Sequence, residues 1–169
     1  MFNKIIELNI FNIDYSIQTK LIMNTCPVHV SQKAYYSIIW ILQCLVVSIY
    51  YNYYLLSTLL FFLTITSIWF WRDCSNTTIR TIDITFATST IIVKNYIAIN
   101  DFTDLYKTIW IISLSICIIS YYINCKFIDY CDNLGIANDN IHIISTYIHM
   151  FFMHFLVTSV FSFCLILSK

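Results

Sequence analysis

The longest uncharged stretch of the chain is residues 34–71, AYYSIIWILQCLVVSIYYNYYLLSTLLFFLTITSIWFW. A helix rises about 1.5 Å per residue and a bilayer core of about 30 Å takes roughly 20 residues, so this stretch is too long for one crossing. Two antiparallel helices fit better, with the turn at Asn52, where four neighbouring tyrosines suit the headgroup level of a membrane. The sequence therefore predicts a hairpin of membrane helices over 34–51 and 53–71.

The composition of the whole 169-residue chain favours a membrane protein. Apolar residues make up 59% and charged residues 11%, whereas a soluble domain has about 45–50% and about 25%. Nine Lys and Arg balance nine Asp and Glu, so there is no basic excess that would bind nucleic acid. The composition argues against an ordinary soluble domain and against a nucleic-acid partner, and it indicates a lipid bilayer as the surroundings of the chain.

Three further apolar stretches follow the hairpin, with predicted spans at 81–99, 108–124 and 143–167. Residues 1–33 carry charges at short intervals and are interpreted as a polar N-terminal arm, and 34–169 as the transmembrane helical domain. The apolar stretches contain no Gly or Pro, which disfavours the broken helices of a transporter or channel subunit. The predicted fold is all-α, a polytopic transmembrane helix bundle of about five spans.

The orientation of the bundle follows from the Lys and Arg residues near the span ends. Six of them share the side of the N-terminal arm: Lys4, Lys20, Lys33, Arg72, Arg80 and Lys126. Lys107 and Lys169 are on the other side, and Lys94, inside the third span, is expected to extend its ammonium to that far interface. The N-terminus is therefore predicted in the cytosol and the C-terminus on the opposite side.

The ionisable groups inside the spans are the candidates for chemistry, because each costs about 2.5–3.5 kcal/mol near a helix centre. Counting residues from the span ends puts Ser67, Asp83, His142 and His149 in one leaflet, with His154 near the midplane. A hydroxyl, a carboxylate and imidazoles at one depth are the parts of a hydrolytic site, because a carboxylate orients an imidazole or a metal-bound water and imidazoles hold zinc or move protons.

Simpler structural interpretations exist for the same residues. Asp83 would pair with Arg80 on its own helix face, Ser67 would bond back to its own helix backbone, and the histidines would donate to neighbouring carbonyls. His149 and His154 are five residues apart, about 140° around a regular helix, so they do not chelate one metal easily. A π-bulge at 150–153 would add the turn that brings both rings onto one face.

The order of these residues resembles the CREST superfamily of membrane hydrolases, which includes alkaline ceramidases. The resemblance is carried by Ser67 in SIWFWR (67–72), Asp83 in TIDI (81–84), and His149 and His154 in HMFFMH (149–154). It implies zinc held by histidines and hydrolysis of lipid amides or esters.

This chain departs from the family in three ways. The His of the first motif is absent, since Trp71 or Arg72 stands there, and the final pair has one residue too many between its histidines. The family has seven spans, whereas five are predicted here. The missing histidine implies a degenerate site, or one in which His142 substitutes.

Two functions remain open. The first is a zinc-dependent membrane hydrolase of lipid amides or esters. Its metal ligands would be His149, His154 and His142, with Asp83 orienting the water and Ser67 donating to the oxyanion. The second is a non-catalytic scaffold or assembly subunit, whose apolar faces pack against membrane-protein partners or another copy of the chain.

Overall fold

The computed structural model describes residues 35–72, 76–136 and 138–169, and every regular element in them is a helix. The predicted N-terminal arm lies outside the described residues. A short 3₁₀ turn, η1 (Tyr35–Ser37), leads into the helices, which are α3 (Ile38–Tyr50), α4 (Tyr54–Arg72), α5 (Thr77–Asp101), α6 (Asp104–Asn133), and a last continuous helix formed by α7 (Asp139–His149), the π-helix η2 (Met150–Leu156) and α8 (Val157–Leu167). The all-α prediction is confirmed.

Four of the described helices are long and apolar enough to cross a membrane: α4, α5, α6 and the continuous helix α7–η2–α8. The apolar helix α3 is shorter, with 13 residues. The chain is therefore an integral membrane protein by the length and composition of its helices.

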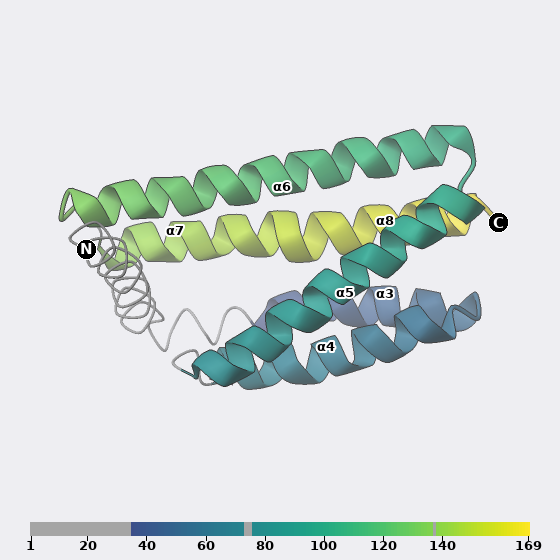
Figure 1. Cartoon of the computed structure of the whole chain (residues 1–169), viewed down its shortest axis with the longest axis horizontal. Helices are drawn as coiled ribbons and strands as arrows, with labels where there is room; N and C mark the ends of the chain where they lie inside the picture. Colours follow the sequence, from purple (N-terminus) through teal and green to yellow (C-terminus); the bar gives the residue numbers. More distant parts are fainter. Residues whose placement is uncertain (1–34, 73–75, 137) are drawn as a thin grey trace, which may run out of the picture.

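The helices form two antiparallel pairs joined by an oblique helix (Figure 1). The first pair is the hairpin α3–α4, and the second is α6 with α7–η2–α8. Packing of α3 on α8 holds the pairs together. Helix α5 packs along α4 and runs obliquely to the start of α6, which it barely contacts. The divergence of α5 from α6 leaves room for a cavity.

The residue types at the turns and at the helix starts explain the local backbone structure. The predicted turn at Asn52 is confirmed, with φ 61°, a left-handed conformation that Asn tolerates better than most residues. The side chain of Asn76 accepts two backbone N–H bonds of 3.1 Å at the start of α5, and Asn138 accepts one of 3.1 Å at the start of α7. Gly135, with φ 65°, follows the end of α6.

Helix α6 is longer than the predicted span 108–124, because it continues to Asn133 through residues that carry charged side chains. Lys126 and Asp129 lie three residues apart on its surface, with Nζ and Oδ2 3.9 Å apart, a spacing that a helix favours. The charged residues that mark the end of the apolar stretch therefore do not mark the end of the helix.

Serine and threonine residues are accommodated in the spans because their hydroxyls donate to the carbonyl four residues earlier. These bonds of 2.8 or 2.9 Å occur at Thr58, Thr64, Thr81, Thr85, Ser89, Thr90, Thr108, Ser115, Thr146 and Ser162. Ser67 differs from these residues, because its hydroxyl donates to a side chain of another helix.

Buried aromatic side chains gather at the end of the bundle that holds the α5–α6 turn, which we call the closed end. Phe161 of α8 is fully buried there, with its ring centroid 5.5 Å from that of Phe102 and 5.2 Å from that of Trp110. The indole Nε1 of Trp110 donates to Asn95 Oδ1 at 2.9 Å. These contacts fix α5, α6 and α8 to one another at this end.

Candidate functional site

A hydroxyl–carboxylate pair joins α4 to α5. Ser67 Oγ donates to Asp83 Oδ1 at 2.7 Å, and Thr66 Oγ1 donates to the same oxygen at 2.9 Å. Two expectations are therefore wrong. Ser67 does not bond back to its own helix, and Asp83 forms no ion pair with Arg80. The reason is that α4 packs closely along α5, so cross-helix donors reach the carboxylate.

The two histidines of the last helix lie side by side. Their ring centroids are 5.4 Å apart, although a regular helix would separate them by about 140°. The difference is the π-helix Met150–Leu156, which begins directly after His149 and contains His154. The π-bulge that the sequence required for this arrangement is confirmed. A hydrogen bond also holds the His154 ring, since Ser37 Oγ and His154 Nδ1 are 3.2 Å apart.

The π-helix is supported by side chains that bond to its carbonyl groups. Cys117 Sγ of α6 donates to the carbonyl of Phe152 at 3.2 Å, and the Thr158 hydroxyl donates to the carbonyl of His154. A widened turn displaces backbone acceptors from their usual partners, and an unsatisfied carbonyl in hydrocarbon costs several kcal/mol. The surrounding residues therefore stabilise the irregular turn.

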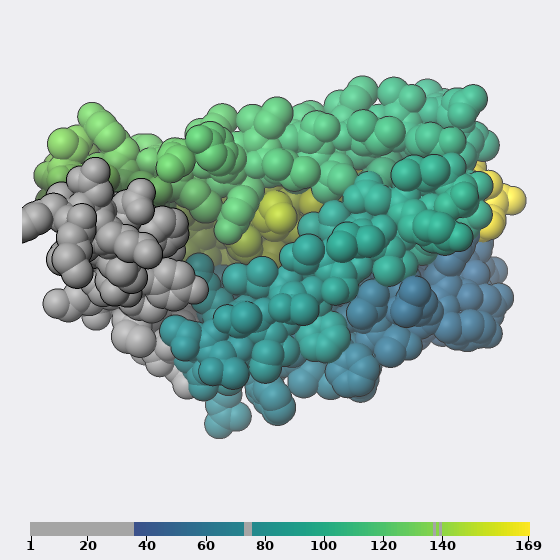
Figure 2. Space-filling model, viewed as in Figure 1, coloured from purple at the N-terminus to yellow at the C-terminus, as the bar shows by residue number. Residues whose placement is uncertain are grey.

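Four of the five predicted site residues line one cavity of about 440 Å³: Ser67, Asp83, His149 and His154. They come from α4, α5, α7 and η2, so residues far apart in sequence meet. The cavity is also lined by polar side chains that include Arg80, Thr90, Lys94, Tyr121, Asn124 and Cys125. In the space-filling view, the last helix is visible in a recess between α5 and α6 (Figure 2).

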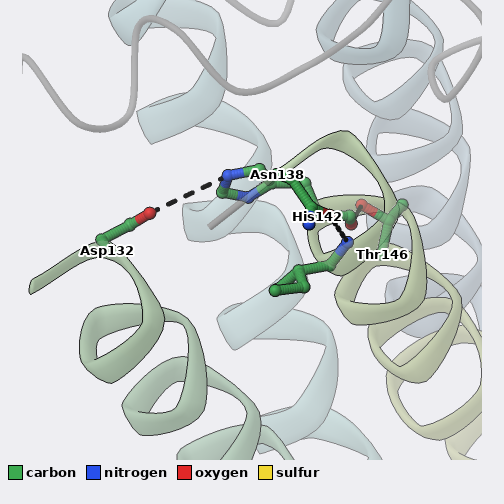
Figure 3. Close-up of polar contacts among 5 residues, drawn as sticks. Asp132, Asn138, His142 and Thr146 are labelled. Atoms are coloured by element: carbon green, nitrogen blue, oxygen red, sulfur yellow. Dashed lines mark hydrogen bonds and ion pairs between the residues drawn. The ribbon is translucent and has the colours of Figure 1, made fainter. Parts of the chain in front are cut away.

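The fifth residue, His142, lies elsewhere. Its Nε2 is 3.9 Å from Asp132 Oδ1, across the α6–α7 turn, and its backbone carbonyl accepts a hydrogen bond of 2.9 Å from Thr146 (Figure 3). It is not part of the cavity lining. The structure does not bring it to the other two histidines, because seven residues of regular helix keep His142 and His149 about 10 Å apart along the axis.

Two further polar residues of the cavity were missed or misjudged from the sequence. Lys94 was expected to extend to the far interface, and this is wrong, because its side chain is 2% exposed and its Nζ lies 5.3 Å from the ring centroid of Phe161. Asn124 is buried, with Nδ2 donating to the Ser145 carbonyl at 3.1 Å and Oδ1 without a partner among the residues that the structure describes.

A signal for Lys94 was present in the sequence. Arg80, Asp83, Ala87, Thr90 and Lys94 follow one another at spacings of three or four residues, which places them on one face of a helix. All five line the cavity. Reading that face as a whole, instead of each charge alone, predicts that Lys94 points inward with Asp83.

A catalytic zinc normally has three protein ligands and one open position. His149 and His154 supply two imidazoles, but no group of three His, Cys, Asp or Glu side chains suitable for a metal occurs among the residues that the structure describes. One oxygen of Asp83 already accepts two hydroxyl donors. The described donor set therefore does not fit a catalytic zinc, and the chemistry below is assigned to protein groups alone.

Comparison with known proteins gives no match. No family model, no curated protein and no solved structure matches the chain. A function must therefore be argued from the cavity.

Proposed function

We propose that the protein is an integral membrane hydrolase of lipid amides or esters, and a divergent relative of the CREST superfamily. One observation carries the proposal. A π-helix turns His149 and His154 into a cavity that they share with Asp83 and its hydrogen-bonded Ser67. π-helices are rare and are frequently found at functional sites. The wider turn of the π-helix also accommodates the one residue by which the spacing of His149 and His154 exceeds that of the final histidine pair in the CREST family.

The position of the cavity suits a lipid substrate. It lies between membrane-crossing helices, and its lining includes apolar side chains from three of them, such as Leu60, Ile84 and Val157. The recess between α5 and α6 gives a route from the hydrocarbon (Figure 2). In the predicted orientation, with the N-terminus in the cytosol, the Arg80 end of the cavity lies toward the cytosol.

The groups in the cavity have distinct roles in this proposal. Hydrolysis adds the hydroxyl of water to the acyl carbon, breaks the C–N or C–O bond, and returns a proton to the leaving group. A neutral imidazole has one acceptor and one donor nitrogen, so the pair His149 and His154 can take the proton from water and deliver it. Asp83, fixed by two hydroxyl donors, orients the water.

Ser67 has a different role from the one that the sequence first indicated. A hydroxyl has a single proton, and that of Ser67 is directed to Asp83 at 2.7 Å. Donation to an oxyanion would require the hydroxyl to rotate after substrate binds. Ser67 is therefore proposed as a positioning residue for Asp83.

The test is hydrolysis of labelled lipid amides and esters by the purified full chain in nanodiscs. We expect Asp83→Asn and His149→Ala to lose about 10²–10⁴-fold in rate, the range of general acid–base contributions. His142→Ala is the matched control, because this histidine lies outside the cavity, and it should keep the wild-type rate.

Several results would contradict the proposal: no hydrolysis of either bond class by wild-type protein, or an Asp83→Asn variant that keeps the full rate. Monodispersity on size exclusion separates loss of chemistry from loss of folding. Stoichiometric zinc in the wild type that is lost in His149→Ala would overturn the assignment of the chemistry to protein groups alone.

A non-catalytic scaffold or assembly subunit is the second candidate. It is favoured by the hydrogen bonds that already satisfy Ser67, Asp83 and His154 across helices, since interhelical bonds of this kind hold membrane bundles together. In that case Asp83→Asn lowers folding yield or assembly with membrane-protein partners or a second copy, and abolishes no lipid-processing activity.

A further inference from the structure

Lys94 is the most unusual charge in the described part of the chain. Lys107 and Lys126 are partly exposed and lie within 4 Å of Asp104 and Asp129, at 3.8 and 3.9 Å. Lys94 is 2% exposed, and no carboxylate of the described residues lies within ion-pair distance of its Nζ. A buried ammonium without a counter-ion is strongly unfavourable, so its presence requires an explanation.

The carboxylate on the same helix face does not neutralise Lys94. Asp83 is eleven residues earlier on α5, which is about 16 Å along the helix axis. Its Oδ1 is occupied by the hydroxyls of Ser67 and Thr66. The nearest described partner of the ammonium is the face of Phe161, a weak cation–π contact at 5.3 Å. Lys94 therefore presents a positive charge to the cavity that it lines.

A second unsatisfied group lines the same cavity. Asn124 Oδ1 of α6 is buried and has no hydrogen-bond partner in the described part of the chain, although Nδ2 of the same side chain is bonded. Buried polar atoms in folded proteins are nearly always paired, so an unpaired donor and an unpaired acceptor facing one cavity point to a missing ligand. That ligand needs an anionic group for Lys94 and an apolar body for side chains such as Leu60, Ile84 and Val157. Asn124 Oδ1 needs a separate donor, such as an ordered water molecule, because a carboxylate only accepts hydrogen bonds.

We propose that the cavity binds a single-chain lipid whose carboxylate pairs with the ammonium of Lys94. If a methylene group takes about the volume of one water molecule, about 30 Å³, the cavity holds roughly 15 such groups. Its volume of about 440 Å³ therefore fits one acyl chain and not two. The carboxylate comes from a free fatty acid of the bilayer or from an acid released by the protein itself.

The experiment measures thermal unfolding of the purified full chain in detergent with palmitic acid, hexadecanol or hexadecylamine, which share one chain length. We expect palmitic acid at a hundredfold excess over Kd to raise the midpoint by about 5–10 °C. Hexadecanol and hexadecylamine should not raise it. Equal shifts with palmitic acid and hexadecanol would overturn the proposal.

Substitutions at Lys94 test whether the thermal response to palmitic acid depends on this lysine. Lys94→Met should lose the response to palmitic acid and, without ligand, should unfold no earlier than wild type, because it removes a buried charge that has no counter-ion. Lys94→Arg should keep the response, and Lys126→Met is the matched control on an exposed lysine. A Lys94→Met protein that still responds to palmitic acid contradicts the proposal. Should Lys94→Met fail to fold, Lys94→Gln is measured in its place.

The inference does not depend on hydrolysis, and Asp83→Asn distinguishes the two proposals. A binding site built around Lys94 predicts that Asp83→Asn still responds to added palmitic acid, even where the variant hydrolyses nothing. Native mass spectrometry of wild type and Asp83→Asn, both expressed with bilayer fatty acids present, identifies the source. Acid bound to both proteins indicates uptake from the bilayer, and acid bound only to wild type indicates a product.

Discussion

The closed end and the cavity differ in how the polar side chains of α5 and α6 are bonded. At the closed end, Trp110 Nε1 donates to Asn95 Oδ1 at 2.9 Å, and aromatic rings fill the space between three helices. In the cavity, the described residues provide no carboxylate partner for Lys94 and no hydrogen-bond partner for Asn124 Oδ1. Both regions use α5, α6 and the last helix. Within the described ranges, unpaired buried hydroxyls also occur outside the cavity, at Ser159 and Ser168, so an unpaired polar group indicates a ligand only together with the cavity that it lines.

The last helix itself contains both kinds of structure. Its α8 segment is regular and buries Phe161, Cys164 and Leu165 completely. Its η2 segment is a π-helix in which no residue is fully buried. A regular helix would serve packing equally well in both segments. The irregular turn lies where His149 and His154 face the cavity, so its role is to orient side chains.

The largest expected effect is a contrast between two single-residue deletions in this helix. Deleting Phe151, whose side chain is half exposed, converts the π-helix into regular helix and leaves His149 and His154 four residues apart, still on one face. The flanking register is kept, so the variant should fold and keep its hydrolytic rate within about threefold. Thermal unfolding and the labelled-lipid assay measure both properties.

Deleting Ser159 is the matched control, because it removes a smaller side chain from regular helix. It rotates Phe161, Cys164 and Leu165 by about 100° toward lipid. Losing three core side chains should cost more than about 5 kcal/mol, so we expect no folded protein. Equal damage from both deletions would show that the π-helix is not an isolated insertion, and the contrast between the two segments would fail.

The second prediction concerns packing at the closed end. Trp110 is 1% exposed, and Trp110→Ala removes its bond to Asn95 and its contact with Phe161. In soluble cores such truncations cost about 3–5 kcal/mol, and we expect about 3 kcal/mol here, since lipid replaces water around the displaced groups. Unfolding in mixed micelles measures the loss.

Trp69→Ala provides the comparison, because Trp69 is 56% exposed on α4. It should change the free energy of unfolding by less than about 0.5 kcal/mol. The folded fraction of Trp110→Ala should respond to palmitic acid as wild type does. A lost response would mean that the closed end shapes the cavity directly.

Sequence reasoning found most of the fold for a simple reason. Uncharged stretches of about 20 residues in a membrane protein permit few structures, so the helices and the turn at Asn52 followed from length and composition. The same reasoning ended α6 too early, because it equated the end of an apolar stretch with the end of a helix.

The site was harder to predict. Counting residues from the ends of the spans gives the depth of each side chain in the membrane. This count alone predicts that Asp83 and His149 lie at a similar depth. The same count wrongly grouped His142 with them, although about two helical turns separate it from His149. It also missed the inward direction of Lys94, which depends on how the helices rotate about their axes. Those rotations are set by contacts such as Cys117 to the Phe152 carbonyl, which no single span reveals.

The smallest predicted effect tests the polar pairing of the closed end at its surface. Tyr53 Oη donates to Asp101 Oδ2 at 2.5 Å, and Lys169 Nζ lies 5.5 Å from the centroid of the Tyr53 ring. Burial, and then the bond to Asp101, raise the pKa of Tyr53 above its ordinary value, while the hydrogen bond with Tyr53 raises the pKa of Lys169. The folded chain therefore favours the protonated form of both groups.

A raised pKa in the folded state stabilises the fold fully below the ordinary pKa, which is about 10 for both groups, and the stabilisation is lost as the pH rises above it. Tyr53→Phe should therefore be less stable than wild type by about 1 kcal/mol at pH 8, and this difference should shrink above pH 10. Chemical unfolding of both proteins between pH 8 and pH 11 measures it, with Tyr50→Phe, at a tyrosine 78% exposed, as the control. A difference that stays constant over this range would mean that the phenol of Tyr53 acts through packing alone, and the pairing that distinguishes the closed end would not extend to its surface.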